Sequence, residues 1–114
     1  MSSPFVIPEE IELLAFFGAE PVERLVDDGY WCYEVVDQRN IRLRFSFNVF
    51  EQSVQTALQV AGASLATIVH EGAQVMSVSG DTLTCRFLYA GGQSTLMLRL
   101  DGSISLEWSS LRTA

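Results

Sequence analysis

The sequence has no lysine, one histidine and two cysteines among its 114 residues. Without lysine, the glycine-containing segment at residues 91–95 is not a phosphate-binding P-loop, which needs a lysine after its glycines, and we predict a turn there. His70 precedes Glu71 as in a metalloprotease helix, but the second histidine of that motif would fall on Gln74. We therefore predict no catalytic residue, no metal site and no cofactor.

The two cysteines, Cys32 and Cys85, are far apart and lie in strand-like runs. We expect Cys32 on a polar face and Cys85 on an apolar face, so that no disulfide joins them. Reduced thiols are typical of cytosolic proteins. The longest apolar runs, such as residues 13–17, are too short to span a bilayer, and the N-terminus lacks the basic and apolar regions of a signal peptide. We expect a cytoplasmic protein that does not enter a membrane.

Negative charge is concentrated in the N-terminal third of the chain. The net charge is -7, and residues 1–37 hold nine acidic residues against Arg24, whereas residues 38–114 hold five acidic residues and six arginines. Such asymmetry is typical of a surface that meets a basic partner; a solvated face is the alternative. The net charge opposes nucleic-acid binding, because phosphate attraction supplies most of that affinity. The candidate partner-binding residues are Glu9, Glu10, Glu12, Glu20, Glu23, Asp27 and Asp28.

Residues 81–108 are predicted to form three consecutive antiparallel strands around which the rest of the chain is organised. Apolar and polar residues alternate along each strand, as in a sheet that is buried on one side. A loop at residues 90–93 and a turn at residues 101–103 produce the apolar pairs Leu83 with Leu100, Cys85 with Leu98, Phe87 with Leu96, Leu100 with Ile104, Leu98 with Leu106 and Leu96 with Trp108.

Residues 30–47 are predicted to form a second hairpin, and side-chain chemistry selects its register. A three-residue loop at residues 38–40 places Glu34 opposite Arg44, whereas a four-residue loop would place this carboxylate opposite Leu43. The favoured register also forms the pairs Trp31 with Phe47, Tyr33 with Phe45, Val35 with Leu43 and Cys32 with Ser46.

The N-terminal segments are predicted to be a helix and a strand. Residues 7–17 repeat apolar side chains at helical spacing, with Pro8 at the first helical position and a stop at Gly18. Residues 20–27 are predicted to be a strand that enters a tight turn, although helical spacing also fits them.

Residues 51–70 match both helical and strand periodicity. Their β-branched content favours two strands joined at Gly62, and a single helix is the alternative. Residues 75–78 begin a further strand that turns at residues 80–81.

The outward face of the sheet formed by residues 81–108 is expected to expose Leu88, Met97 and Tyr30 among arginines. This mixture is typical of interface cores, and the apolar content of 48% points to self-association. We expect the face to be covered by the N-terminal helix or by a second copy in a homodimer; scattered surface apolar residues are the alternative.

These patterns predict one α+β domain over residues 1–114, in which an N-terminal helix packs on a predominantly antiparallel β-meander sheet. In size, acidity and lack of catalytic residues, the chain is similar to small bacterial proteins that inhibit toxins by blocking a basic surface. The predicted function is a non-enzymatic protein-binding module, an acidic inhibitor of the toxin-immunity type. The alternative is a β-rich domain with an apolar ligand pocket lined by Trp31, Tyr33, Phe45, Phe47 and Phe87.

Overall fold

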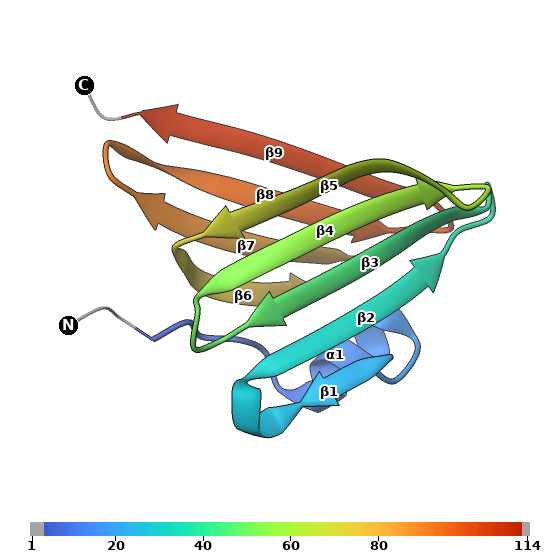
Figure 1. Cartoon of the computed structure of the whole chain (residues 1–114), viewed down its shortest axis with the longest axis horizontal. Coiled ribbons are helices and arrows are strands. Elements are labelled where there is room, and N and C mark those ends of the chain that lie inside the picture. Colours follow the sequence, from blue (N-terminus) through green and yellow to red (C-terminus); the bar gives the residue numbers. More distant parts are fainter. Residues whose placement is uncertain (1–3, 113–114) are drawn as a thin grey trace.

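The computed structural model describes residues 4–112, with side chains described for residues 4–110. The chain has an α+β fold of one α-helix and two antiparallel sheets (Figure 1). Strand order is β1-β2-β3-β4-β5 in the first sheet and β6-β7-β8-β9 in the second. In chain order the elements are α1 (Glu10–Phe17), β1 (Glu23–Leu25), the 3-10 helix η1 (Val26–Asp28), β2 (Tyr30–Val36), β3 (Ile41–Asn48), β4 (Ser53–Val60), β5 (Ala63–Glu71), β6 (Ala73–Ser79), β7 (Thr82–Tyr89), β8 (Gly92–Leu100) and β9 (Ile104–Arg112).

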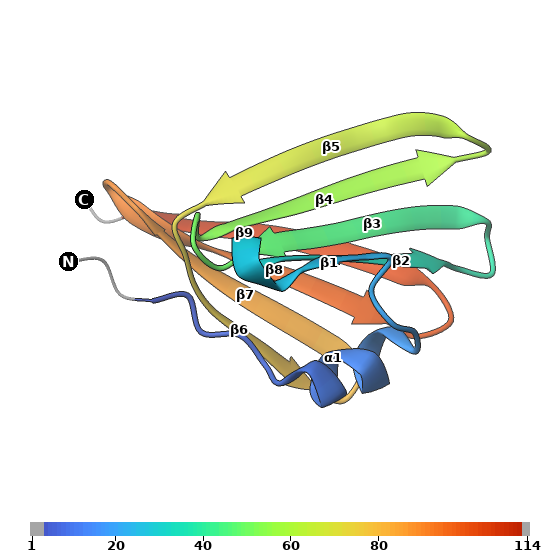
Figure 2. The same cartoon turned by 60° about the horizontal axis from the view of Figure 1, so that its bottom comes forward.

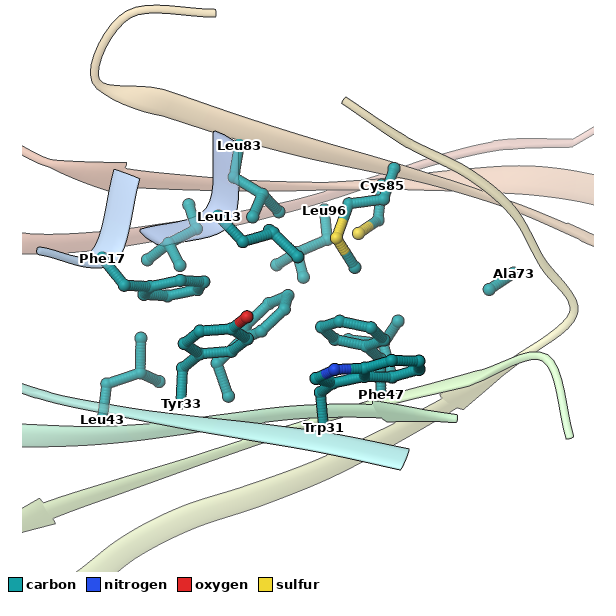
Figure 3. Close-up of a cluster of buried hydrophobic side chains, with 14 of the residues drawn as sticks. Leu13, Phe17, Trp31, Tyr33, Leu43, Phe47, Ala73, Leu83, Cys85 and Leu96 are labelled. Atoms are coloured by element: carbon teal, nitrogen blue, oxygen red, sulfur yellow. The ribbon is translucent and has the colours of Figure 1, made fainter. Parts of the chain in front are cut away.

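The core lies between the two sheets and is rich in aromatic rings. Inward-facing residues of β2 and β3 meet those of β7 and β8, and α1 contributes Leu13 and Phe17 (Figure 3). The rings of Phe17 and Tyr33 stack with their centroids 4.4 Å apart, and those of Trp31 and Phe47 stack at 5.6 Å. Burial of these large side chains stabilises the fold by roughly 1.5–3 kcal/mol each.

Among residues 4–112, no helix has the length and apolar character needed to cross a membrane.

Two hairpins have the predicted register. In the first, Trp31 pairs with Phe47 and Glu34 with Arg44, as the three-residue loop requires. In the second, formed by β8 and β9, Leu98 pairs with Leu106. Both registers are confirmed; in each, the loop length predicted from the sequence selected one of the alignments that keep apolar residues on one face.

The predicted register of β7 and β8 is wrong by two residues. Leu83 pairs with Leu98 instead of Leu100, and Phe87 pairs with Ser94 instead of Leu96. The loop is shorter than predicted, because Tyr89 pairs with Gly92. A shift of two residues leaves every side chain on its original face. Apolar cross-strand pairing favoured the wrong register, because the observed one places Phe87 opposite the polar Ser94.

The remaining local predictions are largely confirmed. The helix ends at Gly18, but it begins at Glu10 with Glu9 as its N-cap, so the placement of Pro8 at the first helical position is wrong. The strand predicted over residues 20–27 is limited to β1, because residues 26–28 form the 3-10 helix η1. Residues 51–71 form β4 and β5, which turn at Gly62, so the helical alternative for this segment is wrong. The strand at residues 75–78 is part of β6.

The helix does not cover the outer face of the second sheet. It lies against β2 and β6 and turns its buried residues towards the core (Figure 2). Leu88 and Met97 are on that outer face and are 51% and 41% exposed. Tyr30 was expected beside them, but it lies on β2 in the first sheet. The prediction for Tyr30 is wrong because it places all strands in one sheet, whereas the strands form two sheets that separate after β5.

The division occurs at Gly72, where the chain passes from β5 to β6. Gly72 has a φ of +82°, a backbone conformation that residues with a side chain rarely adopt. A Cβ atom at this position would also collide with the carbonyl oxygen of Leu88. The Gly72 carbonyl oxygen in turn accepts a hydrogen bond of 2.9 Å from the N–H of Leu88. Close backbone packing against β7 therefore requires glycine at the crossing.

We predict that Gly72→Ala destabilises the protein by about 1–3 kcal/mol from backbone conformation alone, with an added cost for the collision. Urea unfolding would measure the loss. The matched control is Gly91→Ala, which also has a left-handed φ (+91°) but has no atom within 4 Å of the new Cβ. Equal losses for the two variants would show that the approach of Leu88 is unimportant.

Asp37 joins the β2–β3 loop to the start of β9. Its carboxylate accepts hydrogen bonds from the N–H groups of Arg39 (2.8 Å), Ile41 (3.0 Å) and Ile104 (2.9 Å) and forms an ion pair with the Arg39 guanidinium (2.9 Å). Burial by itself raises the pKa of Asp37, but the hydrogen bonds from Ile104, Ile41 and Arg39 outweigh it and hold the pKa well below its usual range. The ionised carboxylate therefore ties the two sheets together.

We predict that Asp37→Asn lowers the melting temperature at neutral pH, because an amide has only one acceptor oxygen and its NH2 group would face backbone donors. Since the folded pKa lies below the unfolded value of 3.8, the native carboxylate stabilises the fold above pH 3.8 and loses this effect as pH falls further. The difference in melting temperature between native and variant protein should thus shrink below that pH. Asp101→Asn, an exposed substitution in the neighbouring turn, is the control. A difference that is independent of pH would contradict the role of the charge.

Candidate functional site

The structure brings the seven predicted acidic residues to one edge of the molecule. They lie on α1, its N-cap, the following loop, β1 and η1, and contacts of Glu10 with Arg24 and Trp31 join α1 to β1 and β2 (Figure 1). All seven are exposed. All seven are therefore accessible to solvent, but their carboxylates differ in whether they are engaged by other groups of the same chain.

Four of the seven carboxylates are used by the fold. Glu9 and Glu12 form a capping box, in which the N–H of Glu9 donates to Glu12 Oε2 at 2.9 Å. Glu10 accepts hydrogen bonds from Arg24 Nη2 at 2.8 Å and from Trp31 Nε1 at 3.3 Å, and so fixes α1 to β1 and β2. Capping groups typically contribute about 1 kcal/mol to helix stability. These side chains hold the edge together as well as adding to its charge.

The fourth engaged carboxylate, Glu23, forms an ion pair of 2.8 Å with Arg44. Arg44 was expected to contact Glu34, which faces it across the β2–β3 pair. Glu34 instead pairs with Arg42 at 2.7 Å. An arginine side chain is long enough to reach a diagonal neighbour, so register alone did not determine the partner.

Three of the predicted acids, Glu20, Asp27 and Asp28, form no ion pair within the described part of the chain. Two of them line a shallow groove of about 510 Å³. Its lining residues come from β1, η1, β2 and the β3–β4 turn: Leu25, Asp27, Asp28, Tyr30, Asn48, Phe50 and Glu51. We call this surface the Phe50 groove.

Phe50 is the most exposed large apolar side chain among the described residues, at 70%. It follows β3 in the turn, where Asn48 Oδ1 accepts hydrogen bonds from the N–H groups of Phe50 and Glu51, both at 3.0 Å. The side-chain nitrogen Nδ2 of Asn48 donates a hydrogen bond of 3.1 Å to the backbone carbonyl oxygen of Asp28 and thus joins the turn to η1. One side chain therefore fixes the backbone of the turn that carries Phe50 and Glu51 beside η1.

Sequence reasoning missed Phe50, Asn48 and Glu51. The available signal was a phenylalanine between two predicted strands, next to glutamate and two residues after asparagine, where a turn is normally polar. Charge counting found Asp27 and Asp28 but did not show that the turn after β3 would lie beside them.

The five aromatic residues proposed as a ligand pocket are all buried. Four of them pack together: the centroids of Tyr33 and Phe47 are 6.4 Å apart, and those of Phe45 and Phe47 are 6.3 Å apart. Phe87 belongs to the other sheet, where its ring lies 6.0 Å from Trp108. These rings contact one another as a packed core.

The histidine and both cysteines are enclosed by other side chains. His70 stacks on Trp108 with centroids 3.7 Å apart, and burial lowers its pKa. Burial also raises the pKa of the Cys32 and Cys85 thiols, which keeps them protonated. Cys32 pairs with Ser46 as predicted, yet it is buried, with Tyr30 and Arg44 among the groups around it. Within the described residues, no three His, Cys, Asp or Glu side chains gather as metal ligands would.

Comparison with known proteins gives one informative likeness. No protein-family model matches the sequence, and no curated protein matches it. The fold is similar to one chain of a contact-dependent growth inhibition toxin–immunity protein complex from Klebsiella pneumoniae 342, with a TM-score of 0.86 and 24% sequence identity. The match covers 93% of this chain and 96% of the other. The two chains therefore share essentially the whole fold.

We predict that Asn48→Ala destabilises the β3–β4 turn by about 1–3 kcal/mol, because it removes three hydrogen bonds made by one side chain. Hydrogen exchange at the Phe50 and Glu51 amides should become faster. Gln55→Ala, an exposed substitution on β4, serves as the control. Unchanged exchange in the Asn48 variant would mean that other contacts hold the groove in place.

Proposed function

We propose that this chain is a non-enzymatic protein-binding module of the immunity type, which binds and blocks a toxin that presents a basic surface. The observation that carries this proposal is the Phe50 groove, where an exposed aromatic ring is surrounded by carboxylates without an internal ion pair. The similarity in fold to a chain of a toxin–immunity protein complex supports the same class of function.

The groove has the composition of a recognition surface. Aromatic residues at the centre of an interface often supply most of the binding energy, and the full burial of one phenylalanine is favourable by roughly 1.5–3 kcal/mol. Leu25, 52% exposed, and the ring of Tyr30 extend the apolar area next to Phe50. A partner that covers the ring would remove apolar surface from water without first having to displace another side chain.

The carboxylates define the chemistry of the partner. Asp27, Asp28 and Glu51 line the same groove, so a partner residue that enters it meets negative charge at short range. Arginine or lysine would pair with these groups, whereas an acidic surface would be repelled. The wider excess of acids in residues 1–37 would accelerate the encounter with a basic protein at low salt.

We place the protein in the cytoplasm as part of this proposal. Its two cysteines are free and buried, which suits a reducing compartment. A toxin would be neutralised there after entry, before it reached an intracellular target.

The test begins with isolation of the partner from lysate of the native cell by using the tagged protein. Binding of the purified partner is then measured for the native chain and three variants. Phe50→Ala should weaken binding by about tenfold or more, which corresponds to about 1.4 kcal/mol. The triple variant Asp27→Asn, Asp28→Asn, Glu51→Gln should weaken binding mainly at low salt, because screening removes part of the attraction at high salt.

The matched control removes the same number of charges elsewhere, through Glu71→Gln, Asp101→Asn and Glu107→Gln, all of which are exposed. This variant should bind almost as well as the native chain. If both triple variants lose affinity equally, the attraction comes from net charge and not from the groove. If neither Phe50→Ala nor the groove triple changes affinity, the partner binds elsewhere.

A further inference from the structure

Strand β5 is the free edge of the first sheet, and it is unusually exposed. Residues 63–69 are all exposed, although they lie in a nine-residue strand that pairs with β4 along its length. Leu65, Ile68 and Val69 are 64%, 38% and 58% exposed. Figure 2 shows β5 as the outermost strand of its sheet, with no further element beyond it. Its outer N–H and C=O groups therefore face away from the described part of the molecule.

The usual means of protecting an edge strand are scarce along β5. Proteins blunt such edges with proline, lysine or other charges, and residues 63–69 contain none of these. A bulge leaves Leu65 without a partner on β4, but residues 66–71 pair regularly after it. This six-residue stretch includes three β-branched residues, Thr67, Ile68 and Val69, which favour strand pairing.

The other edge strands of the two sheets are protected from pairing because each is short, covered or charged. Strand β1 has only three residues. The edge of β6 is covered by the N-terminal segment, because the N–H of Val6 donates to the Gln74 carbonyl oxygen and the N–H of Met76 donates to the Val6 carbonyl oxygen. Strand β9 carries the exposed Glu107 at its middle. Among the described strands, β5 is thus the long edge that lacks both a cover and a central charge.

We propose that β5 pairs antiparallel with β5 of a second copy, so that the two first sheets join into one sheet of ten strands. An extended strand is the partner that satisfies a row of free backbone groups, and the copy supplies the same sequence. With Ile68 opposite itself, Thr67 lies opposite Val69 and Ala66 lies opposite His70. In this register no two like charges meet, and β-branched residues face each other across the pair.

Charge placement permits this association despite the net charge of -7. The acidic edge at β1 is four strand spacings from β5, about 19 Å at the usual spacing between strands. In the dimer the two acidic edges would lie at opposite ends of the joined sheet, several Debye lengths apart at physiological salt. Glu71 is the one charged residue of β5 and lies opposite Leu65 in this register, so edges with a single carboxylate at one end meet while the acidic edges stay apart.

The surface of Leu88 and Met97 fits a second copy less well. Met97 pairs with Thr84, so the two apolar residues are separated by four positions along β7, about 13 Å. The exposed Arg86 lies between them. They are separate apolar side chains with a charge between them, whereas β5 offers continuous backbone.

The Phe50 groove lies on β1, η1, β2, the end of β3 and the β3–β4 turn, whereas the proposed dimer contact runs along β5. The experiment therefore needs only the purified chain. Sedimentation over a range of protein concentrations should show the native chain shifting from the mass of one chain to that of two. The amides within residues 66–71 that point away from β4 should exchange more slowly as the concentration rises.

Charged substitutions on the two facing β5 strands test whether these strands form the contact. The Thr67→Lys, Val69→Lys variant should sediment as a monomer, because four lysines would crowd the twofold axis, and the Thr67→Asp, Val69→Asp variant should do the same. An equimolar mixture of the two should form dimers again, through opposite charges. Both positions are exposed, so the variants should keep the native circular dichroism spectrum.

The control is Leu88→Lys with Met97→Lys, which should leave the dimer intact. The proposal is overturned if the native chain is a monomer at every concentration, or if this control dissociates the dimer while the β5 variants do not. It is also overturned if the mixture of oppositely charged β5 variants stays monomeric while each variant remains folded.

Discussion

The stacking of Phe17 on Tyr33, with centroids 4.4 Å apart, is the contact from which the arrangement of the acidic edge follows. It fixes the C-terminal end of α1 against β2 inside the sandwich. Helix α1 in turn presents Glu10 to Arg24 on β1 and to the indole nitrogen of Trp31 on β2. Strand β1 leads directly into η1, where the carbonyl oxygen of Asp28 accepts a hydrogen bond from the Asn48 side chain, so Asp27 and Asp28 are held beside the β3–β4 turn.

The acidic residues divide into those that build this edge and those that remain available to a partner. Glu9, Glu10, Glu12 and Glu23 are bound to backbone groups, to an indole nitrogen or to arginines of the same chain. Exposed ion pairs contribute little to stability, and their charges are already partly compensated. Recognition would therefore depend on the few carboxylates that lie beside the exposed ring of Phe50, even though the electrostatic field of the edge arises from all of them.

The similarity in fold to a chain of the Klebsiella toxin–immunity protein complex exists at 24% identity. Alternation of apolar and polar residues, short turns and a helix that closes the core are enough to specify such a sandwich, and many sequences satisfy them. Surface residues such as Phe50 are not under that constraint. Two chains with this fold can therefore differ in the very side chains that would select a partner.

The sequence by itself determined the order and type of nearly all elements, the face on which each strand residue lies and the registers of β2–β3 and β8–β9. It did so because alternation and turn length are local, and because charged residues opposite apolar ones are costly. Only the tertiary structure decided the division into two sheets at Gly72, the register of β7–β8, which carboxylates are engaged and that Phe50 lies beside Asp27 and Asp28. These features depend on contacts between distant segments or on a shift of two residues that leaves every strand residue on the same face.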